Sequence, residues 1–478
     1  MEDTKQLTAK KEEDFSEWFQ QLIQKAELIE YSKVSGCYIL RPRAYSMWNA
    51  GKIFFNNLIT KDKVEEAYFP LLIPESLFKK ESEHVEGFTP EVAWVTEAGS
   101  AKLNERLAIR PTSETIMYES YAKWIRSYKD LPLRINQWCN VVRWEFKNPT
   151  PFLRSREFLW QEGHTAFAKK EEAKKEAKKI LKFYKKLFEE MYAVPVIEGI
   201  KSKKEKFAGA DYTLSVETFL PNGKAIQGAT SHHLGQNFSK VFDIKFLDNN
   251  EKESFVYQNS WGYSTRSIGM MIMMHSDNKG LVTPPKMALN KIVIIPILIK
   301  GKEEATLKQA RQLKKQLKIF APILDDRREY SAGWKFNEWE LKGVPIRIEI
   351  GPKDIENKQV VLVRRDTNNK TEIKLSNLKK EIKWQLNEIQ KSLFEKAKTH
   401  LENSIAETSD YEELKKLIRE KKLVLAPHCG NPECEDLIKE ELEGVKTINS
   451  PLKNSKTKDR CIKCNKKSKY KIYFGKSY

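Results

Sequence analysis

The side chains best suited to chemistry gather in one stretch, residues 143–165, which reads Arg-Trp-Glu-Phe-Lys-Asn-Pro-Thr-Pro-Phe-Leu-Arg-Ser-Arg-Glu-Phe-Leu-Trp-Gln-Glu-Gly-His-Thr. Two strand-like segments, Val141–Phe146 and Glu157–Thr165, flank the Asn and Pro residues of Lys147–Pro151. Alternating apolar residues on either side of such a break are typical of a β-hairpin. The sequence therefore predicts a hairpin that carries the candidate site.

The alternation of side chains along a strand decides which of these groups lie together. Arg143 and Glu145 should share one face of the first predicted strand. One face of the second predicted strand should carry Phe158, Trp160, Glu162 and His164. Arg154 and Arg156 come from the loop. Such a surface can bind an anion, stack a planar base and hold a small cation; the alternative is a salt-bridged sheet surface.

The composition indicates a folded chain with a basic surface. Its 478 residues suffice for about three domains, and 40% hydrophobic with 11% aromatic residues allow substantial cores. The net charge of +19, from 85 Lys and Arg against 66 Asp and Glu, suits a polyanionic partner, nucleic acid first. A general bias toward lysine is the alternative source of that excess.

The sequence also bears on the cellular setting. No apolar run approaches 18 residues, and the first residues, Met-Glu-Asp-Thr-Lys-Gln, hold no signal-peptide core. A soluble, cytoplasmic protein without membrane contact is therefore expected. Six cysteines in a chain of this length do not make a disulfide framework.

Hydrophobic spacing places the hairpin in a first unit that mixes helices and strands. Helices are predicted at Glu12–Glu30, Tyr45–Ile59, Glu114–Tyr128, Lys169–Tyr192 and the Met-rich, core-forming Ile268–His275. Strands are predicted at Gly36–Arg41, Leu107–Ile109, Tyr212–Glu217, Gly223–Gly228 and Val241–Leu247. Thr112 or Ser113 can cap the helix that begins at Glu114. The prolines of Glu66–Pro74 favour an edge strand or an interface.

The pattern changes near Pro284-Pro285, which reads as a linker. The β-branched run Lys291–Ile299 predicts a strand buried on both faces. Three further helices (Glu303–Lys318, Trp334–Lys342 and one from Ser376) alternate with strands at Ile319–Leu324, Pro345–Ile350 and Gln359–Arg364. This alternation predicts a compact α/β domain, followed by a Lys-rich third unit over Asp410–Tyr478.

No Walker loop, dinucleotide-binding glycine motif or kinase signature is present, so a nucleotide would have to be held by arginines on an antiparallel sheet. Several stretches together resemble the class II aminoacyl-tRNA synthetases, and closely the prolyl-tRNA synthetase family of the archaeal and eukaryotic type. The class motifs are matched by Tyr68–Pro74 (motif 1), Arg143–Glu145 with its loop and Phe158 (motif 2), and Gly262–Gly269 (motif 3). The prolyl-specific sequences are matched by Arg110–Glu114, Arg154–His164 and Gln227–Asn237.

The resemblance implies an α/β multidomain fold. Residues 1–284 would form a class II catalytic domain on an antiparallel sheet flanked by helices, residues 285–400 an α/β anticodon-binding domain, and residues 401–478 a small α+β zinc-type domain. It implies a homodimer, joined through motif 1, that activates L-proline with ATP and Mg²⁺ and transfers proline to the 3′ end of tRNA(Pro). The alternatives are a threonyl or glycyl enzyme of the same class and an inactive, synthetase-like tRNA-binding protein.

The resemblance also implies roles for single residues. Arg143 and Arg266 would be catalytic, Arg143 because its planar fork can bridge the proline carboxylate and the α-phosphate. The ATP-binding residues would be Arg143, Glu145, Arg154, Phe158, Gln227, Thr230, Ser264 and Arg266. The L-proline-binding residues would be Thr112, Glu114, Arg143, Trp160, Glu162, His164, Phe207 and His232. Motifs 2 and 3 lie too close together for an editing insertion, so no hydrolysis of mischarged alanyl-tRNA is expected.

The stretch Gly333–Lys353 is similar to the anticodon-binding sequence of the family. Glu340, Arg347 and Lys353 would contact the two guanines of a proline anticodon. Arg can donate to guanine acceptors, and Glu can accept from guanine amino groups on unstacked bases. Ordinary surface charge is the alternative for each of the three.

Four cysteines near the C-terminus have the spacing of a structural zinc site. Four residues separate Cys429 from Cys434, and two separate Cys461 from Cys464. The alternative is a set of reduced cysteines without metal. Cys37 and Cys139 are expected in the core, and a threonyl-type zinc at Cys139 is disfavoured because the motif around it is absent. The final Tyr478 matches the family ending whose carboxylate folds back near the active site.

Overall fold

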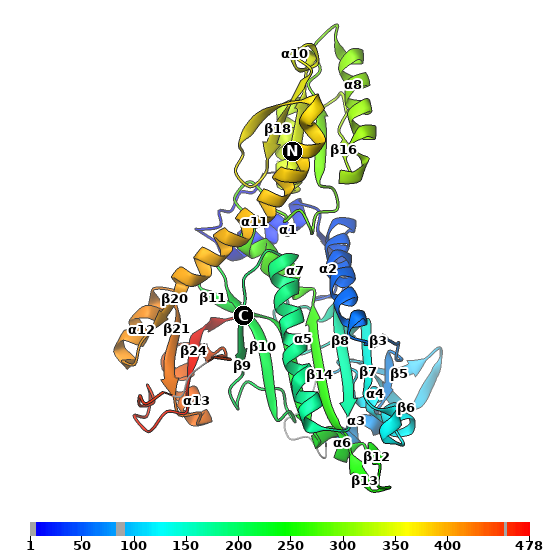
Figure 1. The fold of residues 1–478 in the computed structure, drawn as a ribbon, viewed down its shortest axis with the longest axis vertical. Coiled ribbons are helices and arrows are strands. Elements are labelled where there is room, and N and C mark those ends of the chain that lie inside the picture. Colours follow the sequence, from blue (N-terminus) through cyan, green and yellow to red (C-terminus); the bar gives the residue numbers. More distant parts are fainter. Residues whose placement is uncertain (1–5, 83–90, 454–456) are drawn as a thin grey trace.

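The computed structural model describes residues 6–82, 91–453 and 457–478. A twelve-stranded, mostly antiparallel sheet occupies the lower half of the molecule (Figure 1). Its main path runs β20-β21-β24-β11-β14-β8-β7-β3, and β10, β9, β22 and β23 pair alongside that path. Within the described ranges, no helix has both the length and the apolar composition that crossing a bilayer requires.

The N-terminal unit supplies most of this sheet and the helices that cover it. Its strands are β1 Ile29–Tyr31, β2 Tyr38–Leu40, β3 Glu65–Glu66, β4 Leu72–Pro74, β5 Trp94–Ala98, β6 Ala101–Ile109, β7 Leu133–Val142, β8 Glu157–Phe167, β9 Ile197–Ile200, β10 Tyr212–Phe219, β11 Lys224–Gly235, β12 Lys245–Leu247, β13 Glu253–Phe255 and β14 Tyr257–Ser264. Its helices are α1 Phe15–Lys25, α2 Pro42–Lys61, α3 Glu75–Ser82, α4 Glu114–Trp124, α5 Lys170–Glu190, α6 Asn237–Val241 and α7 Arg266–His275.

Helices α5 and α7 lie across one face of the sheet and close its core (Figure 1). The apolar stripe of α5 is buried and most of its Lys and Glu residues face solvent, as its pattern predicts. Gly228 of β11 lies so close to Phe188 of α5 that a Cβ atom there would be 2.7 Å from the ring. Every residue of α7 from Ser267 to His275 is buried, which confirms that its methionines are core residues.

The hairpin forms, but its first strand lies earlier in the chain than predicted. Strand β7 ends at Val142, so the prediction of a strand over Val141–Phe146 is wrong. The physical reason is a change of backbone partner: the amide of Arg143 still bonds to Arg156, whereas the amide of Trp144 bonds to Glu91 outside the hairpin. The chain therefore leaves β8 at this point.

Several other boundaries differ from the predictions; helix α1, for example, ends at Lys25, five residues before the predicted end. Of the strand predicted at Val241–Leu247 only β12, Lys245–Leu247, forms; the residues before it are the end of α6 and a turn, in which Asp243 has a φ of 55°. The strand predicted at Ile319–Leu324 is interrupted by Ala321 at a φ of 50°, so only β16, Ile323–Leu324, forms. Helix α4 ends at Trp124, four residues before the predicted end.

Strand β4 forms the end of the proline-containing segment that favoured an edge strand, and Pro74 is its last residue. The small sheet that holds it has the order β4-β6-β5, so β4 lies at the edge as expected. Tyr68, just before it, is 72% exposed, and Leu72 is 40% exposed. Large apolar side chains are therefore presented to solvent beside an open strand edge.

The middle unit stands at the top of the molecule (Figure 1). Its five-stranded sheet has the order β16-β15-β17-β18-β19, and every residue of β15 is buried, as the β-branched run predicts. The remaining strands are β15 Ile292–Pro296, β17 Ile346–Ile350, β18 Gln359–Arg364 and β19 Lys370–Lys374. Its helices are α8 Glu303–Gln316, α9 Ala332–Leu341 and α10 Pro352–Glu356.

Helix α11, Leu378–Ser404, descends from the middle unit to a C-terminal unit beside the large sheet (Figure 1). That unit contains β20 Ile405–Glu407, α12 Tyr411–Arg419, β21 Leu423–His428, α13 Pro432–Glu441, β22 Val445–Thr447, β23 Ser450–Pro451 and β24 Tyr470–Ser477. Strand β24 pairs in parallel with β11, and β23 pairs with β9. The C-terminal strands therefore extend the sheet that carries the hairpin.

Candidate active site

A cavity of about 280 Å³ opens on the large sheet, between the side chains of β8, β11 and β14 and the loop after β9. All eight residues predicted to bind proline line it: Thr112, Glu114, Arg143, Trp160, Glu162, His164, Phe207 and His232. Five more residues predicted to bind ATP line it too: Phe158, Gln227, Thr230, Ser264 and Arg266. Segments from residue 112 to residue 266 thus converge on one cavity.

Glu162 is the most heavily hydrogen-bonded group at the cavity floor. It is 3% exposed, and its Oε1 atom accepts from the Ser113 hydroxyl at 2.5 Å and from the Gln137 amide at 3.0 Å. Its Oε2 atom lies 3.0 Å from Nε2 of His164. Burial alone would raise the pKa of Glu162, but the bonds from His164, Ser113 and Gln137 outweigh it and hold the pKa below its ordinary value. The floor therefore carries a buried negative charge.

This arrangement corrects one prediction about the helix that begins at Glu114. Ser113 is the residue before α4, but its side chain makes no capping bond to that helix. Its hydroxyl and its backbone amide both donate to Glu162 instead. Ser113 therefore supports the cavity floor, a contact that no local pattern could predict because Glu162 lies 49 residues away.

His232 is held as a neutral ring at the wall of the cavity. Its Nδ1 atom lies 2.9 Å from the Thr213 hydroxyl and its Nε2 atom 3.0 Å from the Thr230 hydroxyl. Burial, with the nearby charges of His164 and Arg143, lowers the pKa of His232 to about 3. The ring of Phe207 lies 4.6 Å from that of His232, centroid to centroid. The two rings form an uncharged wall.

Arg143 projects from just past the end of β7 into the cavity. Its guanidinium lies 5.1 Å from the ring centre of Trp160 and 5.8 Å from that of Phe158. Its Nε atom donates to the carbonyl of Pro111 at 3.1 Å, which fixes the stem and leaves the two terminal nitrogens directed elsewhere. An aromatic platform of this kind holds a guanidinium without neutralising it.

Arg266, the first residue of α7, comes directly after β14 and lines the same cavity. Its Nε atom donates to the carbonyl of Leu153 at 3.1 Å. Burial, with repulsion from Arg143 and Arg154, lowers the pKa of Arg266 to about 10, so it remains a cation at neutral pH. Clustered cations that repel one another form a site for an anion.

Three hairpin residues lie outside the cavity. Glu145 is exposed on the loop beyond β7 and does not line the cavity, because β7 ends before it. Arg154 is exposed and lines a neighbouring cleft of about 1410 Å³, which Tyr478 also lines. Arg156 donates to the carbonyls of Ser35 and Phe146 and thus packs the hairpin against the N-terminal strands.

Some lining residues were not predicted at all. Glu205, Thr213 and Ser260 contribute polar atoms to the cavity, and none belongs to a motif that single-sequence reasoning could single out. Cys139, expected in the core, is half-buried; its Sγ atom lies 3.3 Å from Nε1 of Trp160 and 3.4 Å from Oε1 of Glu162. Burial raises the pKa of this thiol above its ordinary value, so it stays protonated.

The three residues predicted to bind an anticodon lie in the middle unit. Nη1 of Arg347 lies 2.9 Å from Oε1 of Glu340, and Nε of Arg347 lies 2.9 Å from Oε1 of Glu349. The guanidinium also lies 4.1 Å from the ring centre of Phe336. Lys353 is exposed on α10. Arg347 and Glu340 are thus one rigid pair, whereas Lys353 lies apart from them on another element.

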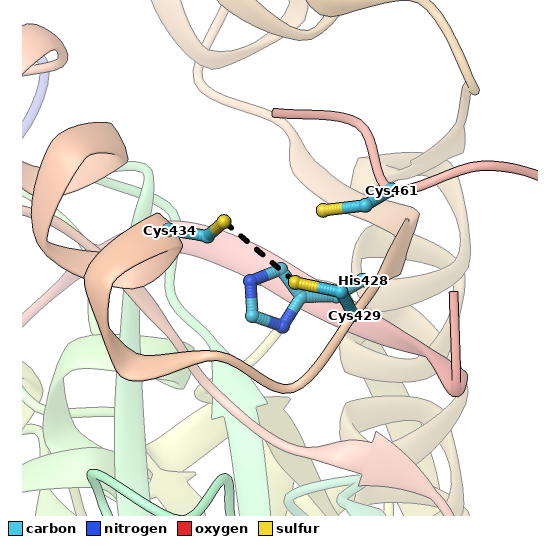
Figure 2. A group of neighbouring side chains, drawn as sticks. All are labelled: His428, Cys429, Cys434 and Cys461. Atoms are coloured by element: carbon cyan, nitrogen blue, oxygen red, sulfur yellow. Dashed lines mark hydrogen bonds between the residues drawn. The ribbon is translucent and has the colours of Figure 1, made fainter. Parts of the chain in front are cut away.

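The four C-terminal cysteines come together, and Figure 2 shows three of them beside His428. The Cys429 Sγ atom lies 3.6 Å from that of Cys434 and 3.7 Å from that of Cys464. In a tetrahedral zinc site with Zn–S bonds of about 2.3 Å, neighbouring sulfurs are about 3.8 Å apart. His428 accepts at Nδ1 from the amide of Gly430, and burial lowers its pKa to about 4. The sulfur spacing therefore fits a zinc ion held by the four cysteines.

Comparison with known proteins places these units in sequence families. Residues 88–275 match the family model described as "tRNA synthetase class II core domain (G, H, P, S and T)". Residues 291–385 match "Anticodon binding domain", and residues 411–478 match "Prolyl-tRNA synthetase, C-terminal". The cavity lies within the first match and the cysteine cluster within the third.

Known proteins are similar to this chain over almost its whole length. The chain is 49% identical to "Proline--tRNA ligase, cytoplasmic" of Arabidopsis thaliana, over 99% of this chain and 91% of the relative. It is 48% identical to "Proline--tRNA ligase 2" of Bacillus thuringiensis subsp. konkukian, over 99% of both chains. It is also 48% identical to "Bifunctional glutamate/proline--tRNA ligase" of Drosophila melanogaster, of which it spans 29%. The chain therefore belongs to the prolyl-tRNA synthetase family of class II aminoacyl-tRNA synthetases.

Proposed function

We propose that this chain is a cytoplasmic proline–tRNA ligase that forms prolyl-adenylate from L-proline and ATP and then transfers proline to the 3′ end of tRNA(Pro). One observation carries the proposal: every residue assigned to proline lines the same cavity as Arg143, Phe158 and Arg266. Amino-acid activation needs the carboxylate and the α-phosphate side by side, and a shared cavity provides that proximity.

The end of the cavity near Glu162 suits the proline ring and its secondary ammonium. Glu114 is 4% exposed, and the Thr112 hydroxyl donates to its carboxyl group, whose oxygens can accept from an ammonium. The neutral wall of Phe207 and His232 and the ring of Trp160 would enclose the apolar methylenes. In this proposal Glu114 and Thr112 hold the ammonium, and Glu162 and His164 close the bottom of the pocket.

Arg143 would lie where the two substrates meet. Its terminal nitrogens can donate to the proline carboxylate and to the α-phosphate at once, which orients the nucleophile and neutralises charge that builds on the phosphate. Arg266 would neutralise phosphate charge and cover one face of the adenine, with Phe158 on the other. Gln227, Thr230 and Ser264 supply polar atoms along the same wall.

Glu145 and Arg154 are assigned to ATP only as residues of the loop that follows β7. Glu145 would accept from the adenine amino group and Arg154 would neutralise an outer phosphate, and both assignments require this loop to approach the cavity when ATP binds. Mg²⁺ would arrive bound to the phosphate oxygens of ATP and supply further charge neutralisation. The four cysteines Cys429, Cys434, Cys461 and Cys464 would hold a structural Zn²⁺ that organises the C-terminal unit.

The proposal also assigns the three domains, the tRNA contacts and the dimer interface. Residues 1–284 would be the catalytic domain, residues 285–400 the anticodon-binding domain and residues 401–478 the C-terminal zinc-type domain. Glu340, Arg347 and Lys353 would contact the anticodon. A homodimer would form at the edge strand β4, where Tyr68 and Leu72 are exposed. The basic excess of +19 supports a tRNA partner.

Charging of tRNA tests the proposal. The purified chain, ATP, Mg²⁺ and radiolabelled amino acids are incubated with a tRNA(Pro) transcript and, as a control, with a tRNA(Thr) transcript. Proline attached to tRNA(Pro), with no threonine attached to either transcript, is the expected result. Threonine on tRNA(Thr) would indicate another enzyme of the class, and tRNA binding without any charging would indicate an inactive relative.

A further inference from the structure

A buried polar contact joins the C-terminal unit to the loop that forms one wall of the amino-acid pocket. The Ser202 hydroxyl donates to Oε2 of Glu435 at 2.8 Å, and the Thr447 hydroxyl donates to the same atom at 2.6 Å. The three residues are 2%, 6% and 3% exposed. Ser202 follows β9 of the first unit, whereas Glu435 and Thr447 lie more than 230 residues later. We call these three residues the latch.

A short series of contacts connects the latch to the pocket. The Ser202 hydroxyl accepts from the amide of Glu205 at 3.2 Å, and the Ser202 carbonyl accepts from the amide of Lys206 at 3.0 Å. Glu205 and Phe207 both line the cavity. The ring of Phe207 then lies against His232, 4.6 Å away. The position of Ser202 therefore limits the position of the loop that carries the pocket wall.

The start of the loop is also held by other contacts: Ile200 of β9 pairs with Ser450 of β23, and Lys201 forms a buried ion pair with Glu217. The loop runs from Lys201 to Asp211 without regular structure, between β9 and β10. An exposed ion pair between Lys204 and Asp436 also joins it to α13, but exposed pairs contribute little to stability. At its far end the Phe207 amide donates to the Thr213 hydroxyl at 2.9 Å. Hydrogen bonds that are shielded from water are stronger than an exposed ion pair, so for residues 202–207 the latch is the stronger of these two ties to the C-terminal unit.

Glu435 is also adjacent in sequence to Cys434, one of the clustered cysteines. Both lie in the first turns of α13 and both are buried. The cysteine cluster thus holds the end of the helix from which Glu435 reaches the loop. This places the latch between the proposed zinc site and the wall of the pocket.

We propose that Glu435 is a positioning residue for the amino-acid pocket: from the C-terminal unit it fixes the loop of residues 202–207 and thereby sets the affinity for the amino acid. The proposal rests on the proposed function for the identity of that amino acid as proline. Glu435 touches no substrate and would act through Ser202 and Phe207. Loss of the latch should therefore weaken amino-acid binding much more than ATP binding.

The test is a comparison of Michaelis constants in proline-dependent ATP–pyrophosphate exchange by the full chain. Glu435→Ala should raise the KM for proline about five- to tenfold, the effect of losing about one buried hydrogen bond, with the KM for ATP and kcat within about twofold of the unmodified chain. Glu435→Gln keeps an oxygen that can accept from both hydroxyls, so it should return the KM for proline to within about twofold of the original. Glu440→Ala, on the exposed face of α13, is the matched control and should change nothing.

Ser202→Ala provides a second route to the same result. It removes the donor from the first unit without touching the helix that carries Cys434, so it remains informative if Glu435→Ala fails to fold. The double variant should show no more than the larger single effect, because both changes break one contact. A KM for proline that is unchanged in Ser202→Ala, or that rises in step with the KM for ATP and with a loss of thermal stability, overturns the proposal. If the unmodified chain shows no proline-dependent exchange, the proposed function fails and the latch proposal fails with it.

Discussion

Nε2 of His164 lies 3.0 Å from Oε2 of Glu162, two residues earlier on the same face of β8, at the buried end of the candidate active site. The other ring nitrogen, Nδ1, lies 3.2 Å from the Tyr118 hydroxyl. Both nitrogens of the imidazole therefore have partners, and the ring cannot rotate without breaking one contact. Side chains that are fixed in this way can shape a pocket before its ligand arrives.

Gln137 should matter for proline binding although it does not line the cavity. It donates to Oε1 of Glu162 at 3.0 Å and to the Ser113 hydroxyl at 3.1 Å. Gln137→Leu removes a hydrogen bond to a buried carboxylate, worth about 1.5–3 kcal/mol, so the KM for proline should rise about tenfold or more. Pyrophosphate exchange with varied proline measures it. Gln312→Leu, exposed on α8, is the control, and equal KM values for the two variants would contradict the prediction.

Removal of the cysteine site should release metal. Elemental analysis of the purified chain should give one zinc per chain, and Cys461→Ser should abolish it, because a thiolate ligand is lost from a four-sulfur site. Cys37→Ser, a cysteine outside the cluster, should keep the zinc. Zinc retained in full by Cys461→Ser, or absent from the unmodified chain, would show that the cluster is a set of reduced thiols.

If Glu340 contacts the anticodon, its loss should affect tRNA charging but not pyrophosphate exchange. Glu340→Ala frees Arg347 from one of its two carboxylate partners and should lower the rate of tRNA charging about tenfold or more, while pyrophosphate exchange, which needs no tRNA, stays unchanged. Glu356→Ala breaks only an exposed pair with Lys302 and should leave both rates unchanged. Loss of both activities in Glu340→Ala would point to a folding defect and refute the assignment.

The buried His275 should make the chain less stable in acid. Burial lowers its pKa to about 4 in the folded chain, against about 6.5 when unfolded, so between these values the unfolded chain binds the extra proton. Stability should therefore fall as pH drops from 6.5 to 4, by at most about 1.4 kcal/mol per pH unit from this residue. The melting temperature of His275→Gln should show a shallower pH dependence over that interval. Parallel curves for the variant and the unmodified chain would contradict this.

The sequence predicted which residues line the cavity better than it predicted where the strands that carry them end. The alternation Phe158, Trp160, Glu162, His164 did place one face of β8 on the cavity, because β8 was predicted within two residues of its true end. The same argument failed for Glu145, since β7 ends at Val142, where the amide of Trp144 takes a partner on another segment. A backbone hydrogen bond between distant segments cannot be predicted from the local sequence pattern.

Local sequence patterns did not predict the residues that support the site either. Gln137 meets Glu162 only because β7 and β8 pair in a register that sets these two residues opposite each other. Ser113 was predicted as a helix cap. Its hydroxyl donates instead to a stronger acceptor, the buried carboxylate of Glu162. Phe207 entered through the family resemblance alone, because it lies on a loop with no periodicity.

Activation of proline in the cavity can be measured directly. The most direct measurement is ATP–pyrophosphate exchange with proline, threonine, cysteine and alanine side by side, using the unmodified chain and Arg143→Lys. Proline should give by far the highest kcat/KM, with weak exchange for alanine and cysteine because an apolar pocket distinguishes neighbours by about 1–3 kcal/mol per methylene. Arg143→Lys should lose most of the exchange, because a single ammonium cannot bridge carboxylate and phosphate as a planar fork does. Exchange that depends on threonine rather than proline, or that survives in Arg143→Lys, would contradict the account.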